Sequence, residues 1–357
     1  MGITLYKNAD WILTVNEKRE KFRHGDLLIS GKEILDVGND LEKKYAGKLQ
    51  IDKTIDAKGT VILPGFVNIH HHTWQSLIRN IQATRGLKLE PWLTVMYEIY
   101  KDLNTDVARA GVYSGLGDML KTGCTTSNDL WYPHPVGVKY LVDAEIQAAA
   151  EIGIRFHPTR GFHSVPSDIV PPEVVDTKES VTEDTIRLVK KYHDRSRFSM
   201  CQVGIAPSIA QYETEDIIEA VVDLAEEYDI MVHGHLAESQ HEVEYTLKTW
   251  GCRPFEWFKR HRLLGKRFYF AHCIHLNEEE IEQMAETETG VAHCPISNML
   301  LSSGACPVPS YLKHGLTRIG LGVDGAASSN SSNMLEEIRC AYLLNPSDLG
   351  RSGGNTR

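Results

Sequence analysis

The pattern of apolar and polar positions changes near residue 60. In the first 60 residues, short apolar runs such as "DWILTV", "GDLLIS" and "KEILDVG" alternate with charged or glycine-containing turns, which is typical of short strands. From Val61 onward, runs of strand length alternate with longer segments of helical periodicity. The pattern predicts a small β unit over residues 1–60, a larger β/α domain over residues 61–343 and an irregular tail over residues 344–357.

Eight candidate strands occur in the larger domain. They span residues 61–69, 124–130, 154–160, 199–207, 230–238, 267–275, 290–297 and 318–325. Helical patterns follow at residues 89–121 (two helices), 138–152, 181–195, 215–228, 241–260, 277–286, 307–314 and 331–342, with Thr214 and Asn277 as expected N-caps. Eight strands, each followed by a helix, predict a closed (β/α)8 barrel. An open doubly wound sheet is the alternative, but no glycine-rich phosphate loop follows the first strand.

Residues that can bind a metal or transfer protons lie at the ends of several expected strands. They are His70, His72, His235, Glu238, His272 and Asp324. In a (β/α)8 barrel, the active site is built at the carboxyl ends of the strands. Histidines exposed on the surface would instead be expected mostly on helices and loops. The placement therefore indicates one functional site at the carboxyl rim of the barrel.

The run "HHH" at residues 70–72 has a spacing that suits metal binding. Alternate residues of a strand point to the same side, so His70 and His72 can bind one ion while His71 faces away. His235 and Asp324 would complete a shell of nitrogen and oxygen donors for Zn2+ or a similar divalent ion, with Fe2+ as the alternative. Such an ion leaves a position for water and lowers the pKa of that water toward about 7.

Two further rim residues suit acid–base chemistry. Glu238 closely follows His235, so its carboxyl group can move a proton from the water to the substrate. His272 can orient the attacking oxygen or polarise the leaving group. We count Asp324 with the catalytic residues as well as with the ligands. Each candidate also has a structural explanation, since "HLAE" could begin a helix, Asp324 could lie in a turn and His272 could be a buried structural histidine. His233 is expected to pack deeper in the barrel.

Composition and charge narrow the range of partners. The 357-residue chain has 42% hydrophobic and 24% charged residues, as in an ordinary soluble globular protein, and a formal net charge of −10. The negative charge argues against nucleic acid or an anionic membrane as the main partner. No secretory signal, myristoylation motif or membrane-length apolar stretch is recognisable. The seven cysteines lack a C-x-x-C pair, which fits reduced thiols, so a cytoplasmic location is expected.

Five motifs lie between residues 64 and 339, within a resemblance to a known family that runs from about residue 5 to residue 343. They read "PGFVNIHHH", "HGHLAES", "AHCIHL", "AHCPISNMLLSSG" and "LGVDGAASSNSSNMLEEIR". Together they resemble the metal-dependent amidohydrolase superfamily, and within it the branch of deaminases and chlorohydrolases. The resemblance implies a (β/α)8 barrel, a small β-sandwich built partly from the N-terminal segment, and a homo-oligomer.

The same resemblance implies a ligand set. The positions that bind one metal ion in that branch match His70, His72, His235 and Asp324. The position of its proton shuttle matches Glu238, and that of the shuttle's histidine partner matches His272. Branches that hold two metals carry a carboxylated lysine on the fourth strand, whereas "FSMCQVGIAP" has no lysine. One divalent ion is therefore expected.

Three further motifs bear on the substrate. "NIHHHTWQSLIRN", "TGCTTSNDLWY" and "IRFHPTRG" are similar to those of 8-oxoguanine deaminase and of relatives acting on pterins and hydroxylated triazines. Such substrates are flat heteroaromatic rings with lactam groups and an amino-bearing carbon, from which water displaces ammonia. Gln75 suits a lactam edge, Arg160 suits a carbonyl or an anionic ring, and Trp131, with Trp74 and Tyr132, suits stacking. Ordinary packing is the alternative for all of them.

Three functions remain open at the level of the sequence. The leading hypothesis is an aminohydrolase of the zinc type that acts on a purine-like or pterin-like ring. The second is a hydrolase that removes chloride or an alkylamine from a triazine, because the same ligands serve both reactions. The third is a barrel retained for binding or assembly. The final stretch "NPSDLGRSGGNTR" departs from the family, whose members continue further, so we expect a truncated C-terminal part or completion by another chain.

Overall fold

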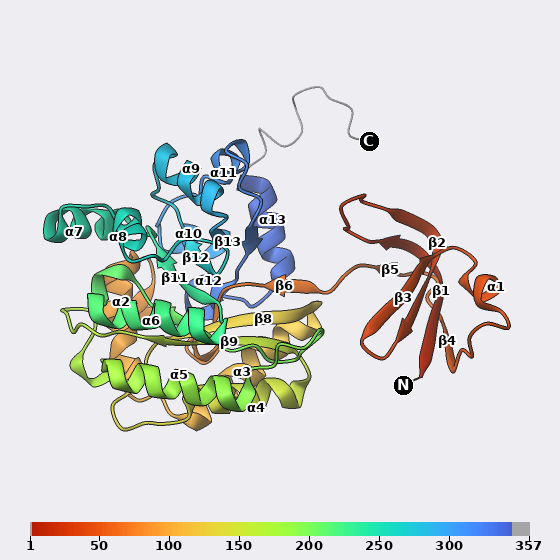
Figure 1. The fold of residues 1–357 in the computed structure, drawn as a ribbon, viewed down its shortest axis with the longest axis horizontal. Helices are drawn as coiled ribbons and strands as arrows, with labels where there is room; N and C mark the ends of the chain where they lie inside the picture. Colours follow the sequence, from red (N-terminus) through yellow and green to blue (C-terminus); the bar gives the residue numbers. More distant parts are fainter. Residues whose placement is uncertain (1, 345–357) are drawn as a thin grey trace. The chain divides into compact units, whose positions relative to one another are not determined.

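The computed structural model describes residues 2–344, which form two compact units (Figure 1). The first unit extends to Gly65, and the second begins at Phe66. The sequence pattern placed this boundary near residue 60. Apart from Leu344, the tail expected over residues 344–357 lies outside the described residues.

A five-stranded sheet forms the first unit. Its elements are β1 (Ile3–Leu13), β2 (Lys21–Ser30), β3 (Glu33–Gly38), β4 (Lys53–Asp56) and β5 (Val61–Ile62), with helix α1 (Leu41–Tyr45). β1 is antiparallel to β2 and parallel to β4 and β5. Val61 and Ile62 thus belong to this sheet, although the pattern assigned them to the first barrel strand. Pro64, which has no N–H to donate, follows β5 and ends the pairing.

Eight parallel strands form the barrel of the second unit. In order around the sheet they are β6 (Phe66–Asn68), β8 (Cys124–Trp131), β9 (Arg155–Phe162), β10 (Gly204–Pro207), β11 (Val232–Leu236), β12 (Phe268–His272), β13 (Gly290–His293) and β14 (Ile319–Leu321). The Ile69 N–H donates to the Leu321 carbonyl at 3.1 Å, which joins the first strand to the last. A short parallel pair, β7 (His71–His72) with β15 (Asp324–Gly325), extends these two strands at their carboxyl ends. The predicted barrel is confirmed.

Helices surround the barrel (Figure 1). They are α2 (Leu89–Tyr100), α3 (Thr105–Lys121), α4 (Leu141–Ile152), α5 (Lys178–Tyr192), α6 (Glu215–Tyr228), α7 (Gln240–Trp250), α8 (Pro254–Arg260), α9 (Glu278–Thr287), α10 (Pro295–Leu300), α11 (Val308–Lys313), α12 (Ala326–Ser329) and α13 (Met334–Leu344). Their apolar sides pack against the strands in one continuous buried core. Asn277 caps α9 in a reciprocal capping box with Glu280, as its position predicted. Thr214 precedes α6 but makes no side-chain cap hydrogen bond.

Two of the differences from the sequence pattern have local reasons. The helix expected over residues 241–260 is split into α7 and α8, because Gly251 ends α7 with a φ of +67° and Pro254 begins α8. The strand expected over residues 290–297 ends at His293, because Pro295 starts helix α10. This change of direction carries the residues after His293 across the carboxyl rim of the barrel.

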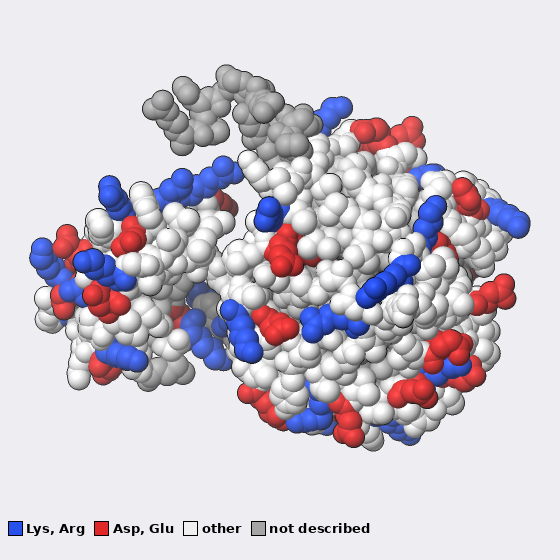
Figure 2. Space-filling view, turned by 180° about the vertical axis from the view of Figure 1, so that it is seen from behind, with Lys and Arg blue, Asp and Glu red and all other residues white. Residues whose placement is uncertain are grey.

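The surface of the second unit carries charges of both signs. On the face seen in Figure 2, lysine and arginine side chains alternate with aspartate and glutamate side chains, without a continuous basic tract among the described residues of that face. Within residues 2–344, no helix has the length and apolar character needed to cross a membrane. The seven cysteines are free thiols, and five of them are buried.

Candidate metal centre and active site

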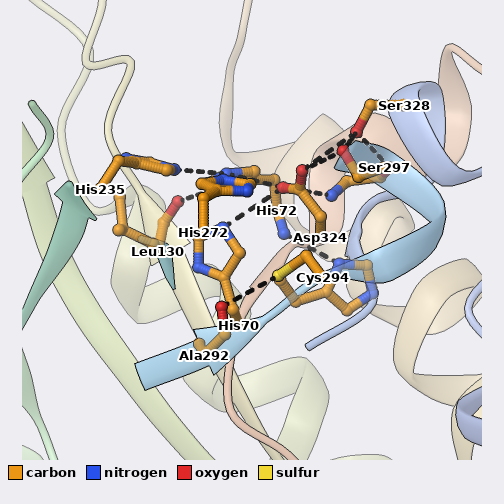
Figure 3. A network of polar contacts seen from close by, with 12 residues as sticks. His70, His72, Leu130, His235, His272, Ala292, Cys294, Ser297, Asp324 and Ser328 are labelled. Atoms are coloured by element: carbon orange, nitrogen blue, oxygen red, sulfur yellow. Dashed lines mark hydrogen bonds and ion pairs between the residues drawn. The ribbon is translucent and has the colours of Figure 1, made fainter. Parts of the chain in front are cut away.

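Four side chains meet at the carboxyl rim of the barrel (Figure 3). His70 and His72 come from the end of the first strand, His235 from β11 and Asp324 from the start of β15. All four side chains are at most 8% exposed. The structure therefore brings together the four residues that the sequence suggested as metal ligands. His71 points elsewhere, since its Nδ1 accepts the N–H of His72 and its Nε2 lies 3.4 Å from Ser332 Oγ.

Hydrogen bonds fix the orientation of each of the three imidazole rings. His72 Nδ1–H donates to the Leu130 carbonyl at 2.7 Å, and His235 Nδ1–H donates to the Ser208 carbonyl at 2.6 Å. In each ring, a proton on Nδ1 leaves the Nε2 lone pair free to bind a metal. Burial lowers the pKa of His72 to about 3, so the ring is neutral near neutral pH, as metal binding requires.

Three of the distances between the candidate ligand atoms match those of a tetrahedral metal site. Asp324 Oδ1 lies 3.3 Å from His70 Nε2 and 3.2 Å from His72 Nε2, and His72 Nε2 lies 3.3 Å from His235 Nε2. Tetrahedral bonds of about 2.0–2.1 Å place neighbouring ligands roughly 3.3 Å apart. His70 Nε2 is buried and has no hydrogen-bond partner. Lone pairs that face one another in this way repel unless a cation lies between them, so the donor set fits a divalent metal.

His233 holds the third ring in place. Its Nδ1–H donates to the Tyr269 carbonyl at 2.9 Å, so its Nε2 must accept the proton of His70 Nδ1, at 2.7 Å. The ring of His233 also stacks on Tyr269, with centroids 4.1 Å apart. The sequence indicated only that His233 packs in the barrel. Its place two residues before His235, on the same strand face, is the signal that could have identified this supporting role.

We expect the substitution His233→Leu to weaken metal binding by about 10–100-fold, because His70 loses the acceptor that fixes its tautomer. Competition between the protein and a chelator would measure the change. Tyr269→Phe is the matched control, since it keeps the backbone carbonyl that holds His233. Unchanged metal affinity in His233→Leu would show that His70 does not need this support.

Asp324 is held as a charged carboxylate. Its Oδ2 accepts hydrogen bonds from Ser297 Oγ at 2.5 Å and from Ser328 Oγ at 3.2 Å, and its Oδ1 accepts the Gly325 N–H at 2.8 Å. Burial opposes the charged form, but the contact of Oδ1 with His70 Nε2 and the neighbouring histidines hold the pKa of Asp324 well below its usual value. A fixed negative charge at this position favours a cation beside it.

Glu238 and His272 lie beside the ligands and face each other. Glu238 Oε2 is 3.4 Å from His272 Nε2, and Glu238 Oε1 accepts a hydrogen bond from Ser303 Oγ at 3.4 Å. His272 Nδ1–H donates to Asn298 Oδ1 at 2.8 Å, which leaves its Nε2 lone pair directed toward Glu238. Burial, followed by the charge of Asp324, raises the pKa of Glu238 well above its usual value. A carboxyl group in this state can both take up and release a proton.

The backbone of this rim is strained. His272, Cys273 and Asp324 have φ angles of 69°, 47° and 58°, and Ala237, before Glu238, has a φ of 50°. Such left-handed conformations are uncommon for residues other than glycine and cost about 1–3 kcal/mol each, and they gather at active sites. Glu242 Oε2 accepts the N–H of Glu238 at 3.0 Å and supports this turn. The strained residues therefore lie in the segments that position the candidate acid–base residues Glu238 and His272.

A cavity opens beside the candidate ligands. Its wall includes the candidate ligands His72, His235 and Asp324 together with Glu238 and His272. The rest of the wall is largely apolar or aromatic and includes Leu89, Trp92, Leu93, Tyr97, Tyr132, Ile209, Tyr212 and Leu301. A flat aromatic ring suits such a lining.

Gln75 lies in the wall of this cavity, as the sequence suggested. It belongs to the 3-10 helix η1 (Thr73–Leu77), and its Nε2 donates to Tyr100 OH at 3.0 Å. Its Oε1 is buried without a hydrogen-bond partner. Gly325 leaves the space for the side-chain amide, because a Cβ at that position would overlap Gln75. The amide is thus packed against Gly325, next to the candidate ligand Asp324, and its oxygen has no hydrogen-bond partner.

The structure does not bring Arg160 or Trp131 to this cavity. Arg160 points to the outside of the barrel, where its Nη2 pairs with Asp176 Oδ1 at 2.9 Å and its Nε with Asp184 Oδ2 at 3.0 Å. Two carboxylates occupy its guanidinium, so none of it is directed at a substrate. Trp131 is fully buried and donates its indole N–H to the Pro133 carbonyl at 2.8 Å. Its ring packs against Trp74, and of the three aromatic candidates only Tyr132 lines the cavity.

Three known enzymes are similar to this chain in sequence. It is 36% identical over 292 residues to 8-oxoguanine deaminase of Pseudomonas aeruginosa, a match that covers 81% of this chain and 65% of that enzyme. It is 30% identical over 354 residues to hydroxydechloroatrazine ethylaminohydrolase of Pseudomonas sp. strain ADP, covering 96% and 73%. It is 32% identical over 342 residues to 5-methylthioadenosine/S-adenosylhomocysteine deaminase of Bacillus cereus, covering 96% and 74%.

Solved structures show the same fold. Triazine hydrolase from Arthrobacter aurescens superposes with a TM-score of 0.88 at 25% identity, over 97% of this chain and 78% of that one. Atrazine chlorohydrolase from the same species, crystallised with zinc, gives a TM-score of 0.88 at 25% identity over 96% and 78%. The model of the amidohydrolase family matches residues 61–355. The chain therefore belongs to the amidohydrolase family, in the branch that contains deaminases and triazine hydrolases.

Proposed function

We propose that the protein is a metal-dependent aminohydrolase that deaminates a purine-like or pterin-like ring of the 8-oxoguanine type and releases ammonia. One observation carries this proposal. Three neutral imidazoles and one carboxylate converge with the spacing of a metal shell, and the Glu238–His272 pair faces the same cavity. The similarity to 8-oxoguanine deaminase supports the choice of ring.

The metal would be held by His70, His72, His235 and Asp324, with Zn2+ as the first expectation and Fe2+ as the alternative. When bound, a divalent ion supplies a Lewis acid that makes water nucleophilic at neutral pH. The four donors and the absence of lysine from β10, which reads "GIAP", favour a single ion. Zinc in the crystallised chlorohydrolase supports the choice of metal.

The protein's own groups would move the protons. Glu238 accepts a proton from the attacking water as the oxygen adds to the amino-bearing carbon, and the same carboxyl group then delivers it to the departing nitrogen. His272, whose Nδ1–H is held by Asn298, keeps its Nε2 lone pair on the cavity side, where it would accept a hydrogen bond from the attacking water and orient it. Gln75, whose side chain lies in the cavity wall, would meet the lactam edge of the ring. The aromatic wall keeps the ring flat against this edge of the site.

Hydrolysis of a triazine is the second candidate. Attack by water at a ring carbon is common to both reactions, and only the leaving group differs, which is an alkylamine or chloride. The 30% identity to hydroxydechloroatrazine ethylaminohydrolase and the fold shared with the triazine hydrolases favour this candidate. The two functions can be distinguished by the product that is released, but not by the set of candidate metal ligands.

A substrate panel tests the proposal. The zinc-loaded protein is incubated with 8-oxoguanine, isoxanthopterin, guanine, hydroxylated aminotriazines and a chlorotriazine, and ammonia, alkylamine and chloride are measured. We expect ammonia from a fused-ring heterocycle at the highest kcat/KM. Release of alkylamine or chloride alone would replace the proposal by the second candidate, and a folded, zinc-loaded protein that acts on none of these compounds would contradict both.

A further inference from the structure

A second polar cluster lies in the wall of the cavity and takes no part in metal binding or proton transfer. It consists of Tyr97 from α2, His163 directly after β9, and Glu213 directly after the short 3-10 helix η4 (Ala210–Tyr212). Tyr97 and His163 line the cavity, and Glu213 lies behind His163. The three residues are 2%, 1% and 4% exposed. We call Tyr97 and His163, with Glu213 behind them, the distal cluster.

Two polar atoms of the distal cluster have no hydrogen-bond partner. Tyr97 OH and His163 Nε2 share a short hydrogen bond. On the other side of the ring, His163 Nδ1 lies 3.5 Å from Glu213 Oε1, and neither atom has a hydrogen-bond partner. The second oxygen of Glu213 accepts a hydrogen bond from Ser164 Oγ at 2.9 Å. The two unpartnered atoms face each other behind the ring, so the ring proton of His163 can lie on either nitrogen. Tyr97 OH can therefore donate to His163 Nε2 and accept from a ligand in the cavity, or accept from His163 Nε2 and donate to that ligand.

The cluster is suited to a neutral ligand group. Burial lowers the pKa of His163 to about 3 and raises the pKa of Glu213 well above its usual value, so both groups are uncharged near neutral pH. A phenol and a neutral imidazole can each donate or accept a hydrogen bond. They present no net charge to attract phosphate or carboxylate. The N–H and C=O of a lactam are the matching partners.

Tyr132 separates the distal cluster from the metal centre. Its ring centroid lies 5.0 Å from that of His72 and 5.3 Å from that of His163. All three side chains line the same cavity. A fused two-ring heterocycle that lies along Tyr132 therefore places one ring beside the metal ligands and the other beside the distal cluster.

We propose that Tyr97 and His163 form a distal subsite that binds a lactam edge on the ring remote from the amino-bearing carbon. This proposal rests on the proposed function and deepens it. In 8-oxoguanine that edge carries an N–H donor and a C=O acceptor, whereas guanine offers a bare ring nitrogen and a C–H in the same places. The distal subsite therefore selects the oxidised purine over its parent. Water replaces the amino group of either compound, so 8-oxoguanine and water give uric acid and ammonia.

The first test compares kcat/KM for 8-oxoguanine with kcat/KM for guanine. We expect the wild-type protein to favour 8-oxoguanine, and Tyr97→Phe and His163→Leu to lower this ratio about tenfold, mainly through KM, because one hydrogen bond to the distal edge is lost. His163→Gln, which keeps a polar side chain of similar reach, should recover part of the ratio. Tyr113→Phe is the matched control, since Tyr113 is 40% exposed on α3 and its hydroxyl donates to Glu151.

The second test needs no turnover. Calorimetry on the zinc-loaded protein compares uric acid, which keeps the distal lactam edge, with xanthine, which lacks it. We expect tighter binding of uric acid by the wild-type protein and an about tenfold smaller preference in Tyr97→Phe and His163→Leu. Metal content and thermal unfolding establish that each variant is folded, and if His163→Leu does not fold, Tyr97→Phe decides alone.

The outcomes distinguish the subsite from the proposed function. A preference for uric acid that is the same in folded variants and wild type, or a wild-type protein that binds the two products equally or not at all, would overturn the subsite. A wild-type protein that deaminates neither purine and does not deaminate isoxanthopterin contradicts the proposed function, and the calorimetric comparison still decides whether the distal edge is bound there. Deamination of both purines with an unchanged ratio in the variants removes the subsite and leaves the function standing.

Discussion

Replacing Glu238 by glutamine is expected to lower kcat for deamination by about 10²–10⁴-fold while the protein keeps its metal. That range is the usual contribution of a general acid–base group. Glutamine has nearly the same shape, so the contact with Ser303 can persist, but the amide cannot accept the proton of the attacking water or return it to the leaving nitrogen. Steady-state ammonia release and metal analysis on the same samples would measure the two effects.

Glu151→Gln is the matched control for this substitution. Glu151 lies on α4, where it pairs with Arg109, and its side chain is 52% exposed. We expect this variant to have wild-type kcat and metal content. If Glu238→Gln kept full turnover, the proton transfers would have to be assigned to another group, and if it lost its metal, Glu238 would act as a ligand.

The ligand histidines should respond differently from the histidine between them. We expect His70→Ala and His235→Ala to lose bound metal on dialysis and, with it, ammonia release, because each removes one Nε2 from the shell. His71→Ala should keep both. His71 is fully buried, however, with its ring against Ser332 and the backbone of His72, so its removal leaves a cavity. We expect that cavity to lower the free energy of unfolding by about 2–4 kcal/mol.

Metal analysis of the three purified variants, together with chemical unfolding, would check these expectations. The comparison is informative because the three substitutions are chemically identical and the three residues are all buried. Equal loss of metal from all three variants would mean that destabilisation, and not ligand removal, causes the loss.

The barrel and its rim could be predicted from the sequence because both follow from simple periodicities. Apolar runs of strand length marked all eight barrel strands, and the rule that parallel barrels carry their sites at the carboxyl ends selected the rim residues. His70 and His72 share a face because they are two residues apart on one strand. His235, Glu238, His272 and Asp324 come from other strands, and only the closure of the barrel brings them together.

The position of Arg160 shows where the sequence was insufficient. Arg160 and His163 lie three residues apart on and after β9, so alternation directs them to opposite sides. The sequence offered no sign of which side faces the cavity. In the structure, Arg160 faces outward to two carboxylates associated with α5, which neutralise it, whereas His163 lines the cavity. The carboxylates lie 16 and 24 residues away in sequence, and a contact at that distance follows from packing alone.

His233 shows a second limit of the sequence. The side of the strand on which His233 lies could be predicted from its spacing to His235. Its hydrogen-bond partner could not be predicted, because His70 lies 163 residues earlier in the chain. Hydrogen bonds between side chains on strands that are remote in sequence depend on register and depth in the barrel. Register and depth therefore decide which buried histidine can bind a metal and which one orients the metal-binding histidine.

The most direct test of a single-metal aminohydrolase is to titrate the metal-free protein with zinc and to measure ammonia release from 8-oxoguanine. We expect activity to rise in proportion to added zinc and to level off at one equivalent per chain, with His70→Ala and His235→Ala inactive throughout. Ammonia release that does not depend on zinc, or that levels off only at two equivalents, would contradict a site built from His70, His72, His235 and Asp324 around one ion.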